Sequence, residues 1–235
     1  GLSTIVFQER SLKNAKVAIN KRRQFVPRRR MFIRQDVVRQ MVLASLGGSR
    51  ERSRAMMFLT TYVFLLRLPS ECLPIIFRGV GSADEAAIGQ ASLYVNEREV
   101  VLRLVRRINV EGGSLLKRGC WCSSCRVTCP LHVLGPFFRS FNIGEAPFGT
   151  FTVSSALNEI RQVLNGLGVA DATRYRTHDL RRGHARDMQA AGYSIKEIKE
   201  RGQWRSPAFL LYLDEDQLEG DAVMDAHLDE SSDSE

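Results

Sequence analysis

Apolar residues recur at helical spacing in the first part of the chain. In residues 31–46 they fall every three or four positions, so they can share one face of a helix. Gly47-Gly48-Ser49 interrupts this pattern, and residues 50–66 are apolar at nearly every position from Met56 onward. This predicts a second helix buried in the core. Pro69 should end or turn it, and we expect residues 70–77 to form a short helix or an irregular segment.

The middle of the chain has the shorter pattern of strands. Residues 92–95 and 99–104 flank an Asn-Glu-Arg turn, and residues 115–117 follow a turn at Gly112-Gly113. They predict a small antiparallel sheet. We expect the segment from the cysteine-rich stretch to Thr150, which is rich in Gly, Pro and Phe, to be a loop.

Helical signals return after Thr150. Residues 153–167 are amphipathic, and residues 178–190 end before Gly192. Ser194 and Glu197 form a capping box for a short helix that ends at Gly202. Ser206-Pro207 should then start the helix that carries Tyr212. The predicted fold class is therefore mainly α with a small antiparallel β-sheet (α+β).

Charge is distributed unevenly along the 235 residues. Residues 214–235 contain ten Asp/Glu and no Lys/Arg, so the remainder has 34 basic and 16 acidic residues, or +18, although the whole chain is only +8. A body this basic favours a polyanionic partner, and nucleic acid is the usual one. We expect an acidic tail at 214–235, with one weak helix at 218–228 and a disordered end.

Residues 1–30 are polar and basic. The cluster at 21–30 is typical of a phosphate-contacting arm, a nuclear localisation signal, or both; a disordered end is the alternative. The first residue is Gly, so we expect a fragment or a processed chain. No signal peptide and no apolar run of membrane-spanning length is found, which leads us to expect a soluble intracellular protein with no membrane partner.

A possible catalytic group is spread over the chain. His178 and Arg181 are three residues apart, a spacing that places an acid/base group and a phosphate-binding cation on one helix face. Tyr212 ends a separate helical segment, from which its phenol could reach the same phosphate. By itself, Tyr212 would more often be a core residue, because Phe209, Leu210 and Leu211 adjoin it.

These residues belong to recognisable segments: His178-x-x-Arg181, then Gly202-x-Trp204 with Tyr212 eight residues later, and upstream Arg67 followed by Glu71. The segments resemble the catalytic half of tyrosine recombinases (phage-integrase-like proteins), most of all the crypton- and DIRS-like recombinases of eukaryotic mobile elements. The resemblance runs from about residue 37 to residue 213. It implies the recombinase catalytic-domain fold over 31–213, with residues 1–30 as the remnant of, or linker from, a missing DNA-clamping domain.

The resemblance also implies an activity on double-stranded DNA. Arg67 and Arg181 would hold the scissile phosphate, since guanidinium groups stay charged and donate paired hydrogen bonds. His178 would manage the phenol proton, and Tyr212 would form a 3′-phosphotyrosyl link. No cofactor is needed for this chemistry. The resemblance further implies DNA recombination or integration of a mobile element, a homotetramer on DNA and a nuclear location.

Two positions of the family pattern are open in this chain. The family has a His or Trp just before the nucleophile segment, which points to Trp204, with Gln203 as the alternative. It also has a Lys on a β-turn, expected near residues 106–109, where none occurs. Lys117 is the nearest lysine, and Arg107 is a poor proton donor. The alternative function is therefore a catalytically inactive, recombinase-derived DNA-binding protein; a zinc-stabilised interaction domain is a third.

A cysteine-rich loop at 119–133 is a second candidate site. Five cysteines in the chain, an odd number, argue against a disulfide framework. Thiolates and an imidazole this close together suit tetrahedral zinc, and we favour Cys120, Cys122, Cys129 and His132, with Cys125 as a possible substitute. Such a zinc would be structural, as four protein ligands leave no open position. The alternative is reduced cysteines packed as small hydrophobes.

Overall fold

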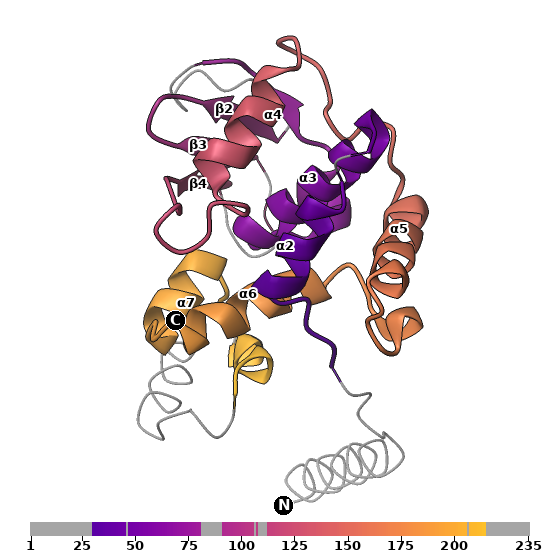
Figure 1. Ribbon diagram of the computed structural model, residues 1–235. Coiled ribbons are helices and arrows are strands. Elements are labelled where there is room, and N and C mark those ends of the chain that lie inside the picture. Colours follow the sequence, from indigo (N-terminus) through magenta and orange to yellow (C-terminus); the bar gives the residue numbers. More distant parts are fainter. Residues whose placement is uncertain are drawn as a thin grey trace, which may run out of the picture. The chain divides into compact units, whose positions relative to one another are not determined.

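The computed structural model (Figure 1) describes residues 30–45, 47–80, 91–105, 107, 112–205 and 207–214. The chain separates into two units, Gly1–Arg30 and Met31–Glu235. Apart from Arg30, the basic segment lies outside the described residues, as do the acidic tail beyond Asp214, most of the turn at 106–109, and Ser206.

Two helices begin the described part. Helix α2 spans Gln35–Leu43 and α3 spans Ser49–Val63, so both predicted helices are confirmed, with somewhat shorter bounds. The α3 side chains are buried on all sides from Ala55 onward, and burial continues to Leu66. A helix that is apolar all round has to lie inside the core, which explains its central position.

A single π-helical turn follows α3. It spans Leu68–Cys72 (η1), with Pro69 at its start and Arg67 at its N-cap. The chain then forms the two-residue strand β1, Ile76–Phe77. The segment predicted as a short helix or irregular thus contains both a helical turn and a strand.

The four strands form one sheet in the order β1-β2-β3-β4. The predicted antiparallel strands are confirmed as β2 (Ser92–Val95), β3 (Val100–Leu104) and β4 (Ser114–Arg118). Strand β1 pairs parallel to β2, so the sheet is mixed and the prediction of a purely antiparallel sheet was wrong. A two-residue strand has too few positions to show an alternating pattern.

Two short helices replace the loop expected before Thr150. They are η3 (Pro130–Leu134) and α4 (Gly135–Arg139), which pack against the sheet (Figure 1). Proline in the first turn of a helix costs no hydrogen bond, so the Pro-rich composition was misleading. Phe137 and Phe138 are buried and contact Phe148.

The last part of the chain is helical, as predicted. Helix α5 spans Val153–Gly166, η4 spans Ala172–Arg174, α6 spans Asp179–Ala190, and α7 spans Ile195–Gly202. The capping box of Ser194 and Glu197 is present. The segment that carries Tyr212 is a 3₁₀ helix, η5, Pro207–Tyr212. Together these elements give an α+β fold.

Helix α6 has the largest role in placing the site. It contacts α2, α3, α7 and η5. A Cβ on Gly183 would lie 1.8 Å from the Ile33 carbonyl oxygen, so α6 can approach residue 33 only because position 183 is glycine. Leu65, Ala185, Phe209 and Leu213 belong to a small apolar cluster that joins α6 to α7, η5 and the end of α3. In the described part of the chain, no helix has the length and apolarity needed to cross a membrane.

Candidate active site

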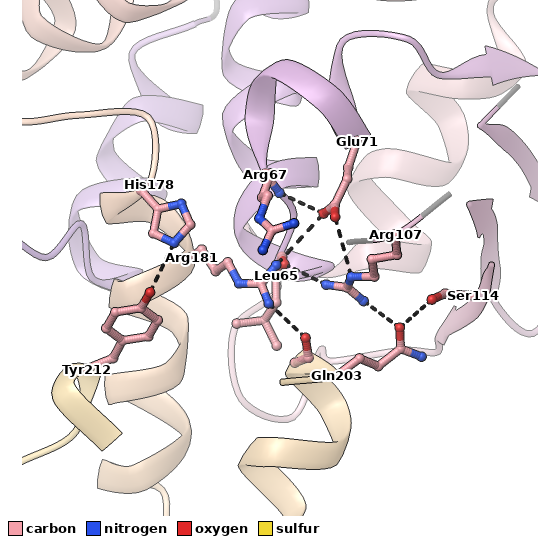
Figure 2. A network of polar contacts seen from close by, with 10 residues as sticks. Leu65, Arg67, Glu71, Arg107, Ser114, His178, Arg181, Gln203 and Tyr212 are labelled. Atoms are coloured by element: carbon pink, nitrogen blue, oxygen red, sulfur yellow. Dashed lines mark hydrogen bonds and ion pairs between the residues drawn. The ribbon is translucent and has the colours of Figure 1, made fainter. Parts of the chain in front are cut away.

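The candidate residues are far apart in the sequence but come together where several elements begin or end. Arg67 is the N-cap of η1, His178 is the N-cap of α6, and Arg181 lies in the first turn of α6. Trp204 follows α7, and Tyr212 ends η5. Figure 2 shows the side chains of Arg67, His178, Arg181 and Tyr212 around one polar site.

Glu71 is the centre of the arginine network. Its side chain is only 2% exposed. Oε2 accepts a 2.8 Å hydrogen bond from the Arg67 backbone N–H and lies 3.8 Å from Arg181 Nη1, while Oε1 lies 3.5 Å from Arg107 Nε. One buried carboxylate therefore faces two buried guanidiniums, and the network keeps an excess positive charge. Glu71 was part of the sequence motif but was missing from the predicted site residues.

Arg181 is held with hydrogen-bonding capacity left unused. Nη2 donates to the Gly202 carbonyl at 2.8 Å, and the guanidinium carbon lies 4.6 Å from the centre of the Trp204 ring. Nε and Nη1 are buried and have no hydrogen-bond acceptor among the described residues. Burial, followed by the charge of Arg107, lowers the pKa of Arg181 to about 9, which still leaves it a cation at neutral pH. Buried donors normally have partners, so an anionic ligand would complete this site.

Gln203 holds Arg107, and Trp204 holds Arg181. Arg107 Nη1 donates to Gln203 Oε1 at 2.8 Å, and its Nη2 donates to the Leu65 carbonyl at 3.0 Å (Figure 2). The Ser114 hydroxyl donates to the same Gln203 oxygen. Both candidates for the position before the nucleophile segment therefore contact an arginine of the network, Gln203 by hydrogen bonding and Trp204 by stacking.

Two strained residues support this arrangement. Leu65 has φ of 53° and Gln203 has φ of 50°, in the left-handed region that non-glycine residues rarely adopt. Each supplies an oxygen that accepts a hydrogen bond from Arg107. Strain of this kind persists where the surroundings over-determine the conformation, which is common at functional sites.

The structure does not bring Lys117 to the site. Side chains alternate along β4, with Ser114 and Leu116 buried and Lys117 exposed on the other face. The Lys117 side chain is 56% exposed, and its Nζ lies 3.8 Å from Glu99. A Lys three residues after Ser114 on a strand must point away from the face that contacts Gln203.

His178 and Tyr212 form the other half of the site. His178 Nε2 lies 3.2 Å from the Tyr212 hydroxyl, which therefore points to a polar group and not into the apolar core (Figure 2). Burial, then the charges of Arg181, Arg182 and Arg67, lower the pKa of His178 to about 4. The imidazole is thus neutral at physiological pH and can accept a proton. Arg182 lies over the Tyr212 ring and pairs with Asp179 at 2.7 Å.

The cysteine-rich loop gathers four potential metal ligands. The Nδ1 atom of His132 lies 3.5, 3.1 and 3.3 Å from the sulfurs of Cys120, Cys122 and Cys129, and all four ligand atoms are within 4.8 Å of one another. Metal bonds of about 2.1–2.3 Å in a tetrahedron correspond to ligand separations of about 3.4–3.8 Å. The cluster could hold a metal ion. Cys125, the alternative ligand, is outside it.

Hydrogen bonds in this loop favour the thiolate form of Cys129. Trp121 N–H donates to Cys129 Sγ at 3.1 Å, and Cys122 N–H donates to Cys120 Sγ at 3.4 Å. Burial opposes ionisation of Cys129, but hydrogen bonds from Trp121 and His132 outweigh it and lower the pKa of this thiol to about 6. Because metals bind the thiolate form, these donors prepare the loop for a cation.

Trp121 links the loop to the candidate active site. Its ring lies edge-on to His184 of α6, at 5.6 Å between centroids, and His184 stacks on Tyr62 of α3 at 4.5 Å. Burial lowers the pKa of His184 to about 3, so its ring is neutral, and Nδ1 lies 2.5 Å from the Tyr62 carbonyl. The loop therefore packs against α6, the helix that carries Arg181, at the point where α6 meets α3.

Comparisons with known proteins do not assign the chain. No protein-family model matches it, and no curated protein matches it either. Inference about function therefore starts from the residues and their geometry.

Proposed function

We propose that the chain cuts and rejoins DNA strands as a tyrosine recombinase, with the fold of that family's catalytic domain. The observation that carries the proposal is the convergence of Arg181, which has two donors without a hydrogen-bond acceptor in the described part of the chain, with Tyr212 and a neutral His178, whose Nε2 lies 3.2 Å from the phenol. A phosphodiester oxygen would satisfy these donors. The basic body of the chain favours DNA as the source of that phosphate.

In the proposed cleavage step, four side chains have separate roles. The Tyr212 oxygen attacks phosphorus, the bond to the 5′ oxygen of the next nucleotide breaks, and His178 Nε2 takes the phenol proton. Arg181 and Arg67 stabilise the charge that develops on the non-bridging oxygens. His178, once it has taken the phenol proton, can return that proton to the leaving 5′ oxygen. The chain thereby keeps a proton donor although Lys117 faces away.

Covalent trapping tests this function without knowledge of the target sequence. The protein would be incubated with a library of duplexes that have randomised flanks and a nick. When cleavage occurs close to the nick, the short strand that carries the leaving 5′ oxygen dissociates, so the strand cannot be rejoined. We expect a protein–DNA adduct that survives denaturation, disappears in Tyr212→Phe, and persists in the matched control Tyr193→Phe. Sequencing the trapped DNA would give the target preference.

The exposed position of Lys117 favours a second candidate, a DNA-binding protein that does not cleave. This candidate predicts salt-sensitive binding to the same library with no adduct from any member. Binding without an adduct would therefore replace the first proposal with the second, and absence of salt-sensitive binding would remove both.

We also propose that Cys120, Cys122, Cys129 and His132 hold a structural zinc ion. Four protein ligands would complete its tetrahedral coordination and leave no position for a substrate. Metal analysis of the purified protein should find one zinc per chain. Cys129→Ser should lose it, and Cys125→Ser, in the same loop but outside the cluster, should retain it; equal zinc content in both variants would contradict the assignment.

A further inference from the structure

Three contacts hold Asp214, two residues after Tyr212. The Asp214 backbone N–H donates to Gln189 Oε1 at 2.6 Å, and Gln189 Nε2 donates to the Asp214 carbonyl at 3.2 Å. Arg186 Nη2 lies 2.8 Å from Asp214 Oδ2. We call Arg186, Gln189 and Asp214 the Asp214 clamp. One amide side chain thus satisfies both backbone groups of a single residue.

The clamp acts on a segment whose internal hydrogen bonding is weak. Element η5 is a single short 3₁₀ helix, and such helices have poor internal hydrogen-bond geometry. Phe209, Leu210 and Leu213 pack on Ala185 and Met188 of α6, but the hydrophobic effect that drives this packing is non-directional. Hydrogen bonds at the end of the segment are directional and can set its rotation.

Two members of the clamp, Arg186 and Gln189, come from the helix that also carries Arg181, the proposed phosphate-binding group. Arg186 and Gln189 lie on α6, whose first turn carries Arg181 and whose N-cap is His178. The clamp therefore ties the Tyr212 segment to the same rigid element as its proposed partners. A displacement of the hydroxyl by about 1 Å would break the 3.2 Å contact with His178, and misplacements of this size can cost on the order of a hundredfold in rate.

We propose that Gln189, assisted by Arg186, is a positioning residue that sets where the Tyr212 hydroxyl lies relative to His178 and Arg181. This inference rests on the proposed function, in which Tyr212 is the nucleophile. Neither side chain touches the phosphate or the reacting atoms. Their effect is on the rate of the covalent step and not on DNA affinity.

The test compares Gln189→Ala with Gln162→Ala, which removes an exposed glutamine from α5. Amide hydrogen exchange of residues 209–214 is measured in the free protein, and single-turnover adduct formation is measured at saturating nicked DNA. We expect Gln189→Ala to accelerate exchange of this segment and to slow adduct formation, each at least tenfold. DNA affinity should stay within about twofold, and Gln162→Ala should match the wild type.

Arg186→Gln provides a graded check, because it removes the ion pair and leaves both Gln189 hydrogen bonds. It should slow adduct formation less than Gln189→Ala does. Wild-type exchange or a wild-type rate in Gln189→Ala would overturn the inference while the proposed function stands. If the wild-type protein forms no adduct, both fail, and the DNA-free exchange measurement still reports whether the clamp holds the segment.

Discussion

At the scale of single residues, the site depends on one guanidinium that is buried, stacked and only partly hydrogen bonded. Arg181 is 2% exposed, and its neighbours Trp204, Gly202 and Glu71 fix its plane. A planar, always-charged group with several donors suits a phosphate better than an ammonium does. The unsatisfied donors represent a cost in the free protein that a bound oxyanion would remove.

Arg181→Lys should therefore slow adduct formation by roughly 10²–10³-fold, as loss of a preorganised donor to a developing oxyanion does. Single-turnover trapping measures this rate. Arg174→Lys is the matched control, since Arg174 is exposed and pairs with Asp171 on the surface. A rate for Arg181→Lys within threefold of the wild type would contradict the assigned role.

His178 should titrate far below its usual range in the free protein. Its resonances should show a midpoint near pH 4, and Arg67→Gln should raise that midpoint by removing a nearby positive charge. Since folding lowers this pKa, the contribution of His178 to stability is complete above about pH 6.5 and is lost as the pH falls toward 4. A midpoint near 6.5 would show that the imidazole is neither buried nor surrounded by cations.

Much of this site could be predicted from the sequence, because its motifs lie at the ends of recognisable helices. Arg67, His178, Arg181 and Tyr212 were predicted and lie around one site. Glu71 could have been predicted from its place in the Arg67 motif. The role of Gln203 could not, because its contact with Arg107 joins residues 96 positions apart in the chain.

At the scale of elements, the cysteine-rich loop supports α6 through Trp121 and His184. Trp121→Ala should lower the free energy of unfolding by about 2 kcal/mol, less than the roughly 3–5 kcal/mol of a fully buried Trp, because Trp121 is partly exposed. Thermal or denaturant unfolding measures this change. Metal chelation should likewise accelerate amide exchange in α6 of the wild type. Unchanged exchange after chelation would show that the loop does not stabilise this helix.

The close approach of α6 to residue 33 gives a second prediction at this scale. Gly183→Ala forces a Cβ against a backbone oxygen that cannot move alone, so it should destabilise the protein by about 1–3 kcal/mol. Gly166→Ala, at the end of α5 with no heavy atom near the added carbon, should be neutral or stabilise by about 0.4–1 kcal/mol. Denaturant unfolding of both variants measures this difference, and equal stability of the two would contradict a close approach of α6 to residue 33.

Element prediction succeeded where a local signal was strong. Capping residues, glycines after helices and alternating strand positions marked α5, α6, α7 and β2–β4. It failed for β1, η3 and α4, which are two to five residues long and are stabilised by pairing with distant segments. The 3₁₀ form of η5 likewise depends on tertiary packing against α6 and α7.

At the scale of the whole molecule, a basic chain has one site where a phenol, an imidazole and two guanidiniums lie together, and we propose that this site binds a phosphate of DNA. Three elements position this site: the buried end of α3, helix α6, which contacts Trp121 of the cysteine-rich loop, and η5, which is followed by the Asp214 clamp. The variants proposed above change different elements, so they separate the contributions of binding, positioning and chemistry.

The central claim is that Tyr212 becomes covalently joined to DNA. Proteolysis of the trapped adduct, followed by mass spectrometry, tests it directly by locating the modified residue. We expect a nucleotide attached through a 3′ phosphate to the Tyr212 oxygen. Attachment to any other side chain, or free Tyr212 in protein that has cleaved DNA, would contradict it.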